Sequence, residues 1–374
     1  MTRDTERRPA TPPFRAEHIG SLLRPPELQR ARQEFEAGTF TAEGLREVED
    51  CCIRDAVRLQ EEVGLQAITD GEFRRTIYFG HFTRAVSGFT EVQSEMTFHG
   101  EQGGLLRYPT AMITGRIRRQ CGIATEEFRF VRSLTGRTPK VTLPSPCSQH
   151  YFRWREGISE RAYPDFEAFF SDVTAVYREE LAELAALGAT LVQLDDVSLP
   201  LLCDERLRAG FAQRGYDPDE WVGRYIQLVN QSLRGRPPDI TVSMHLCRGN
   251  NQGKWLGDGG YDYIAERLFN ELEIDFFCLE YDSPRAGSFV PLRFLPKSKG
   301  VVLGLISSKL AALEDPDQVR QRIDEACKHV ELERLALSPQ CGFASTAPGN
   351  PITPEAQRAK LQLVVDVARE VWGQ

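Results

Sequence analysis

The sequence lacks long apolar runs and an excess of positive charge. No hydrophobic stretch approaches the about 18 residues of a membrane-spanning helix, and residues 1–13 lack the apolar core of a secretory signal. The formal net charge of −8 argues against a nucleic-acid surface, because Lys and Arg drive binding to phosphates. We therefore expect a cytoplasmic protein without a membrane or nucleic-acid partner.

Cysteine is too sparse for a disulfide framework. The nine cysteines are an odd number scattered over 374 residues without a secretory signal, so reduced thiols are expected. Most of them are expected to be small buried residues, because free cysteine packs as a small hydrophobe. Cys247 and Cys341 need a different explanation, because both follow predicted strands.

Short runs typical of strands alternate along the chain with long amphipathic segments typical of helices. Eight strands are predicted, at residues 16–19, 66–69, 140–143, 190–194, 240–244, 276–279, 301–305 and 335–337. Helices are predicted between them, at residues 26–37, 41–63, 165–187, 218–233, 261–272, 317–329 and 354–371. Eight such units favour a closed α/β barrel, the (β/α)8 TIM barrel, over an open sheet.

One segment, at residues 95–117, interrupts this alternation. Gly100, Gly103 and Gly104 separate two β-rich stretches in it, which predicts a hairpin inserted beside the barrel mouth. No low-complexity block or internal repeat separates two halves of the chain. We predict a flexible tail over residues 1–11 and a single catalytic barrel over residues 12–374.

Polar or reactive side chains follow every predicted strand, where a TIM barrel builds its active site. His245 and Cys247 are two residues apart in an extended segment, so both side chains point the same way. Glu280 follows another apolar strand and Cys341 follows the last one. Two thiolates, an imidazole and a carboxylate suit tetrahedral Zn²⁺. The spacing alone leaves open a structural reading, with packed cysteines, a hydrogen-bonded histidine and an ion-paired glutamate.

Three further residues at the predicted mouth are candidates for substrate binding. Asp195 and Glu72 offer carboxylates that could hold a substrate ammonium, although a helix cap or an arginine partner would explain either residue. Ser21 lies in a turn that could present backbone N–H groups to a carboxylate, or that is only a turn.

Six motifs carry a resemblance to a known family. They are HIGSLLRP at 18–25, TDGEFRRTIYF at 69–79, VQLDDVSLP at 192–200, HLCRGN at 245–250, LEYDSPRAGSF at 279–289 and LSPQCGFAS at 337–345. Together and in this order, they resemble the cobalamin-independent methionine synthases. Within that family the chain is similar to short proteins that match only the catalytic C-terminal barrel of the full-length enzyme.

The resemblance implies a cofactor, a reaction and roles for particular residues. The positions that match the zinc ligands of the family are His245, Cys247, Glu280 and Cys341. Those that match its contacts to the amino-acid part of homocysteine are Ser21, Glu72 and Asp195. The implied activity is zinc-dependent methyl transfer to the thiol of homocysteine, as in a 5-methyltetrahydropteroyltriglutamate–homocysteine S-methyltransferase.

The chain departs from the family at the donor side. Ile306 stands where the full-length enzymes have a histidine thought to protonate the departing folate. A methylated corrinoid protein or a small methyl compound is therefore an alternative donor. An epoxyalkane:coenzyme M transferase is the alternative activity, with Arg74, Arg248 and Lys309 available for the sulfonate. A non-catalytic regulator that binds zinc or a thiol is the alternative of another class.

Overall fold

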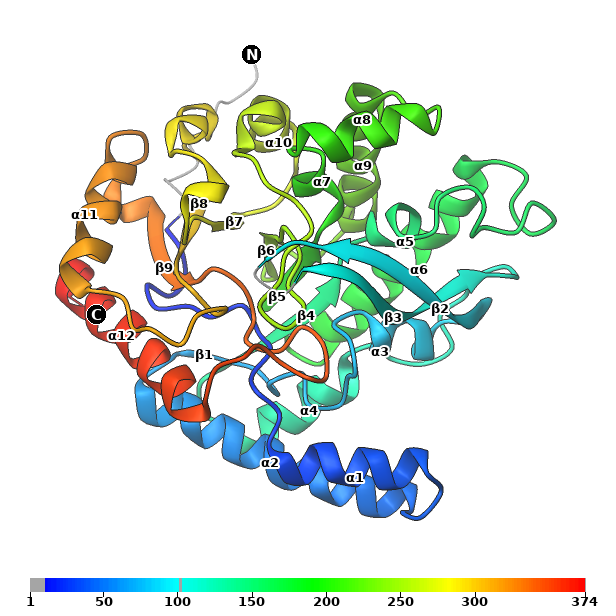
Figure 1. The fold of residues 1–374 in the computed structure, drawn as a ribbon, viewed down its shortest axis with the longest axis horizontal. Helices are drawn as coiled ribbons and strands as arrows, with labels where there is room; N and C mark the ends of the chain where they lie inside the picture. The colour runs from blue at the N-terminus through cyan, green and yellow to red at the C-terminus, as the bar shows by residue number, and fades with distance from the viewer. Residues whose placement is uncertain (1–10, 101–102, 374) are drawn as a thin grey trace.

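The computed structural model describes residues 11–100 and 103–373, so residues 1–10 of the predicted tail lie outside the described residues. A curled parallel sheet forms the centre, and helices surround its outer face (Figure 1). Its seven strands run in the order β1-β4-β5-β6-β7-β8-β9. They are β1 (Ala67–Ile68), β4 (Thr138–Pro144), β5 (Leu191–Asp196), β6 (Thr241–Leu246), β7 (Phe276–Glu280), β8 (Gly300–Ile306) and β9 (Leu335–Pro339). This confirms a TIM-barrel-like α/β fold.

The prediction of a strand at residues 16–19 is wrong. Ala16 makes a single parallel bridge to Leu337 of β9. The backbone N–H of Glu17 donates to the Leu337 carbonyl at 2.9 Å, and the Leu337 N–H donates to the Arg15 carbonyl at 2.8 Å. Beyond this point the carbonyl of His18 accepts from the Lys140 ammonium. The Lys140 side chain therefore occupies the His18 carbonyl. The segment lies where an eighth strand would lie, but it does not form a series of backbone hydrogen bonds with its neighbours.

Arg15 fastens this segment to the sheet. Its guanidinium is buried and donates to the carbonyls of Glu333 at 3.0 Å and Leu335 at 2.7 Å. We expect Arg15→Met to lower the free energy of unfolding by about 1–3 kcal/mol, because buried carbonyls lose their donors. Urea denaturation measures this loss, with the exposed Arg58 replaced by Met as the control. Equal losses in both variants would contradict a fastening role.

Helices occur at all seven predicted positions, although the helix predicted at residues 261–272 covers only part of that range, and most of the seven begin at a polar cap. The side chains of Thr41, Asp165, Asp217, Asp315 and Thr353 each accept a hydrogen bond from the first turn of the helix that follows. These helices are α1 (Pro26–Glu36), α2 (Ala42–Val63), α6 (Phe166–Ala186), α9 (Pro218–Leu233), α10 (Ala265–Glu271), α11 (Pro316–Cys327) and α12 (Pro354–Trp372). Within the described ranges we find no helix whose length and hydropathy would let it cross a bilayer.

Five further helices were not predicted. They are α3 (Gly80–Ala85), α4 (Thr125–Leu134), α5 (Ser148–Tyr151), α7 (Ser198–Leu201) and α8 (Glu205–Gln213). Yet α4 is amphipathic, and Asp204 caps the first turn of α8. Single 3-10 turns occur at Tyr261–Tyr263, Pro284–Ala286, Val290–Phe294 and Leu332–Arg334.

The predicted hairpin is confirmed, but it begins earlier than residue 95. Its strands are β2 (Phe89–Phe98) and β3 (Gly104–Ile113), which pair antiparallel along their whole length. Figure 1 shows the hairpin beside the ends of β4, β5 and β6. His99 and Trp255 exchange backbone hydrogen bonds of 2.6 and 3.1 Å, which fasten the hairpin to the loop after β6.

Candidate metal centre

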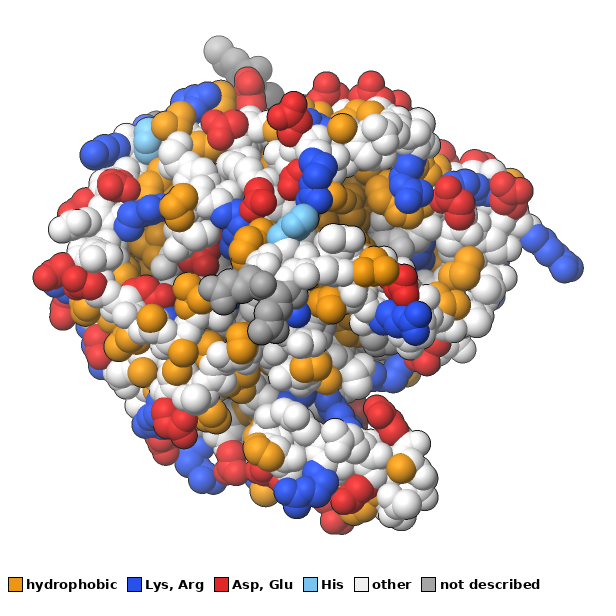
Figure 2. All heavy atoms as spheres, viewed as in Figure 1, with side chains coloured by type: hydrophobic (Ala, Val, Ile, Leu, Met, Phe, Trp, Pro, Cys, Tyr) orange, Lys and Arg blue, Asp and Glu red, His pale blue; other side chains and the backbone are white. Residues whose placement is uncertain are grey.

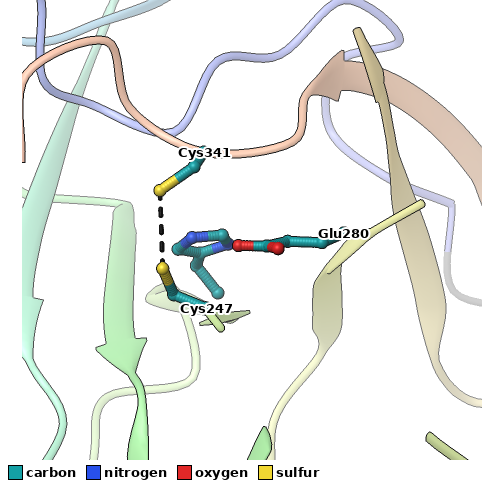
Figure 3. A group of neighbouring side chains, drawn as sticks. Cys247, Glu280 and Cys341 are labelled. Atoms are coloured by element: carbon teal, nitrogen blue, oxygen red, sulfur yellow. Dashed lines mark hydrogen bonds between the residues drawn. The ribbon is translucent and has the colours of Figure 1, made fainter. Parts of the chain in front are cut away.

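Four side chains meet at the carboxyl ends of β6, β7 and β9. His245 lies within β6 and Cys247 is the first residue after β6. Glu280 ends β7, and Cys341 comes two residues after the end of β9. One nitrogen, sulfur or oxygen atom from each residue lies within 4.8 Å of the others, and all four residues are buried. In Figure 3 the sulfurs of Cys247 and Cys341 face each other, with the Glu280 carboxylate beside them. The structure therefore brings together the four residues predicted as ligands.

The histidine and the glutamate each keep one atom free. The Nδ1 atom of His245 lies 3.3 Å from the Cys278 carbonyl, so Nδ1–H donates there and the buried Nε2 has no partner. Glu280 accepts the Arg248 N–H at Oε1 (3.2 Å), while its buried Oε2 has no hydrogen bond and lies 3.7 Å from the Arg285 guanidinium, an ion pair that a cation would compete with. Buried polar atoms without partners are costly. The free nitrogen and oxygen beside two sulfurs therefore fit a bound cation.

The two sulfurs are 3.5 Å apart. Two sulfurs bound at about 2.3 Å to one tetrahedral zinc would be about 3.8 Å apart, so little movement is needed. Their hydrogen bond lowers the pKa of Cys341 well below its usual value and raises that of Cys247, so the pair shares one proton. Binding of a divalent cation would displace this proton, as it does from thiol ligands in general.

The surroundings of His245 carry a surplus of negative charge. Burial alone would lower the pKa of His245, but the Cys341 thiolate and the carboxylates of Asp195 and Glu280 raise it to about 9. A divalent cation would neutralise this negative charge more effectively than a single proton does.

The three predicted substrate contacts line the same cavity as the cluster. Ser21, Glu72 and Asp195 lie on its wall together with His245 and Cys341. Burial, and next the nearby Glu72 carboxylate, raise the pKa of Asp195 to about 7, and burial raises the pKa of Glu72. The Oε2 atom of Glu72 is buried without a partner. The buried guanidinium of Arg75 lies 3.6 Å from Glu72 Oε1, so one positive charge faces these two carboxylates.

The backbone around Glu72 is arranged to aim its carboxylate into the cavity. Glu72 has a φ of 60°, a conformation that is costly for a residue with a side chain. Its N–H donates to Asp70 Oδ1 at 2.9 Å, which holds the turn. Gly20 packs against this turn with a φ of 142°, and a Cβ atom there would lie 2.9 Å from Glu72 Oε1. A larger residue at position 20 would therefore displace the carboxylate.

An apolar wall faces the polar residues, and the sequence reasoning did not name its members from the hairpin. Its members come from the hairpin and from three loops, which precede α3, follow α5 and follow β6: Ile77, Phe79, Met96, Phe98, Tyr108, Phe152 and Leu256. The alternation of apolar residues in β2 was the available signal, because Met96 and Phe98 share a face. The wall makes the cavity half apolar and half acidic.

Two of the three cationic residues considered for a sulfonate are engaged elsewhere, whereas the buried ammonium of Lys309 has no hydrogen-bond partner in the described part of the chain. The guanidinium of Arg248 donates to the Gly259 carbonyl and to the Tyr261 hydroxyl. Arg74 donates to Asp50 at 2.6 Å. Neither arginine lines the cavity, nor does Lys309, and the described residues that line it include no Lys or Arg.

Comparison with known proteins identifies the family. The family described as the cobalamin-independent synthase catalytic domain matches residues 14–370. The chain belongs to this family. The chain is 40% identical to the uncharacterized protein YxjG of Bacillus subtilis strain 168 over 367 residues, 96% of this chain and 95% of YxjG.

Other relatives of this cobalamin-independent synthase bear the name of an activity. It is 27% identical to a methionine synthase of Pyrococcus abyssi over 331 residues, 87% of this chain and 85% of that protein. A putative vitamin-B12 independent methionine synthase from Listeria monocytogenes has a similar solved structure, with a TM-score of 0.75 and 33% identity. The match covers 97% of this chain and 99% of that one. The family predicted from the motifs is thus confirmed.

Proposed function

We propose that this synthase transfers a methyl group to the thiol of homocysteine and forms methionine, with one zinc ion held by His245, Cys247, Glu280 and Cys341. The main support is that this four-residue cluster opens onto the cavity that also contains Glu72 and Asp195. Relatives named methionine synthase support the product.

The protein side of the centre orients the ligands. The Cys278 carbonyl fixes the imidazole of His245 so that Nε2 faces the cluster, and the Arg248 N–H fixes one oxygen of Glu280. The Gly249 N–H donates to the Cys247 sulfur at 3.3 Å and stabilises its anionic form. A bound zinc ion lowers the pKa of a coordinated thiol, so that the reactive thiolate is present at neutral pH.

The acidic half of the cavity holds the amino-acid end of the acceptor. The carboxylates of Glu72 and Asp195 attract the substrate ammonium, and their burial strengthens the attraction. The thiol proton leaves to solvent, and the sulfur forms a bond to the methyl carbon of the donor. The bond between that carbon and the leaving group breaks, and its electron pair departs with the leaving group. No covalent intermediate with the chain is required.

The charge of the cavity favours an amino-acid thiol over a sulfonated one. Coenzyme M would place a sulfonate beside Glu72 and Asp195, and among the described residues no Lys or Arg lines the cavity to balance it. The negative charges of a sulfonate and of these carboxylates would repel each other strongly in a buried site. We therefore favour homocysteine as the acceptor over the coenzyme M alternative.

The direct test incubates the zinc-loaded protein with homocysteine or coenzyme M and a set of donors. The donors are 5-methyltetrahydropteroyltriglutamate, methylcobalamin and an epoxyalkane, and mass spectrometry identifies the products. We expect methionine from homocysteine and no alkylated coenzyme M. If only coenzyme M is alkylated, homocysteine is not the acceptor. If no product forms with any donor, the proposal that the protein catalyses methyl transfer is wrong.

Acceptor binding should depend on the ionisation of Asp195. Because its pKa is raised to about 7, the carboxyl group is protonated below pH 7, and an ammonium ligand must then displace that proton. We expect the dissociation constant of methionine to rise as pH falls from 8 to 5.5, approaching about tenfold per pH unit below 7.

Calorimetry with methionine measures this dependence without a titrating thiol in the ligand. The control ligand is 3-(methylthio)propionate, which lacks the ammonium and should not show the same rise. Zinc is quantified at each pH, because acid also weakens metal binding. A flat profile for methionine would place its ammonium away from Asp195.

A further inference from the structure

A buried lysine, Lys309, follows β8 and differs from the positive charges of the molecular surface. On the face seen in Figure 2, Lys and Arg side chains lie at the surface beside acidic ones, where water screens their charges. Lys309 is only 6% exposed, and within the described residues its Nζ atom is buried without a hydrogen-bond partner. Burying a charge without a partner costs free energy, so the position of this ammonium needs an explanation.

The loop that carries Lys309 is fastened to the residues on either side of Cys341. The backbone N–H of Ser308 donates to Gln340 Oε1 at 2.7 Å. The Ser308 hydroxyl donates to the Gly342 carbonyl at 3.0 Å. Both contacts are buried. The backbone of Lys309 is therefore held beside one of the four residues of the metal cluster.

The charge of Lys309 reaches both sulfurs of the cluster. The hydrogen bond from Cys247 is the largest of the effects that lower the pKa of Cys341, and the Lys309 ammonium acts in the same direction. The bond to Cys341 raises the pKa of Cys247, and Lys309 opposes that rise. Lys309 does not line the catalytic cavity. Its ammonium is therefore close enough to act on the sulfurs without contacting a ligand in the cavity.

Two other buried cations beside the cluster already have partners. Arg285 lies 3.7 Å from the Glu280 carboxylate and 3.6 Å from that of Asp282. The Arg248 guanidinium donates to a carbonyl and a hydroxyl. Two thiolates and a carboxylate around one Zn²⁺ leave one surplus negative charge, and an acceptor thiolate adds a second. The ammonium of Lys309 is available to balance this added charge.

We infer that Lys309 is a positioning residue for methyl transfer, and that its ammonium balances the negative charge that the acceptor thiolate brings to the metal centre. The inference rests on the proposed function. Opposite charges in a buried site attract strongly, because little water screens them. Methyl transfer removes the negative charge from the sulfur, so a neutral thioether gains nothing from Lys309. The ammonium therefore favours binding of the acceptor over retention of the product.

The first test compares a charged sulfur with a neutral one. Homocysteine and methionine share their amino-acid end, so the ratio of their dissociation constants isolates the charge on the sulfur. In zinc-loaded protein we expect Lys309→Met to weaken homocysteine binding about 10- to 100-fold and methionine binding less than about threefold, as measured by calorimetry. Lys309→Arg keeps the charge and should keep the ratio of the parent protein. Lys309→Gln serves for the same comparison if Lys309→Met does not fold.

The second test separates charge from structure. Removing a positive charge from an anionic centre should strengthen its hold on a cation, so Lys309→Met should retain zinc against a chelator at least as well as the parent does. A loosened Cys341 loop would release zinc sooner. The matched control is Lys299→Met, which removes a buried lysine before β8 that donates to the carbonyls of Phe269 and Leu272. This control should change neither the ratio nor the zinc retention.

Equal weakening of both ligands by Lys309→Met, or unchanged homocysteine binding, overturns the inference. Faster zinc loss from Lys309→Met than from the parent overturns it as well, and so does a Lys309→Arg variant with the ratio of Lys309→Met. In each of these cases, homocysteine binding by the zinc-loaded parent leaves the proposed function standing. A parent protein that binds neither zinc nor homocysteine would reject the proposed function and this inference together.

Discussion

Serine in place of Cys247 or Cys341 is expected to remove the bound metal and to lower methionine formation at least about a thousandfold. Four ligands together bind structural zinc with roughly 10–16 kcal/mol, so losing one thiolate costs several kcal/mol. A serine hydroxyl stays protonated at neutral pH and does not replace a thiolate. Elemental analysis gives the zinc content per chain, and product formation gives the rate.

The matched control is Cys52→Ser, which changes a buried cysteine of α2 that lies outside the cluster. This variant should keep about one zinc per chain and its activity. Thermal unfolding of all three variants separates metal loss from misfolding. If Cys247→Ser and Cys341→Ser both retain full zinc, the metal assignment is wrong.

Removing the acidic contacts should affect the acceptor and not the metal. We expect Asp195→Asn or Glu72→Gln to raise the dissociation constant of homocysteine by about 30- to 5000-fold, because truncating one partner of a buried charge pair costs roughly 2–5 kcal/mol. Zinc content should be unchanged in both variants, since neither residue belongs to the cluster.

A ligand without an ammonium isolates this effect. The affinity for 3-mercaptopropionate, which has the thiol and the carboxylate but no amino group, should change less than about threefold in Asp195→Asn, because the lost contact is worth little to it. An equal loss for both ligands would show that Asp195 acts on the thiol side or on folding. Isothermal titration of each ligand decides between these outcomes.

Much of the fold was predictable, because alternating strands and helices give the sequence alternating apolar runs and amphipathic segments. The strands that became β4 to β9 are buried on most of their length and appear as apolar runs. The segment at residues 16–19, with the sequence Ala-Glu-His-Ile, was also predicted as a strand, yet it forms one bridge. Its neighbour Lys140 takes a carbonyl that a ladder would need, and no local pattern encodes that contact.

The grouping of the candidate ligands was predictable for a related reason. Parallel strands bring their carboxyl ends to one rim, so His245, Glu280 and Cys341 had to approach one another once the barrel was assumed. Which atoms stay free was not predictable. The Cys278 carbonyl that orients His245 belongs to a neighbouring strand in register with it, and only the sheet defines that register.

The sequence by itself determined the class of fold, the residue types at the strand ends and the family, because period and motif order are local properties of the chain. The tertiary structure alone decided that Arg74, Arg248 and Lys309 stay outside the cavity and that the hairpin supplies an apolar wall. Side-chain direction depends on packing between distant segments. That packing sets the charge and the shape of the cavity, and the spacing of residues along the chain does not specify it.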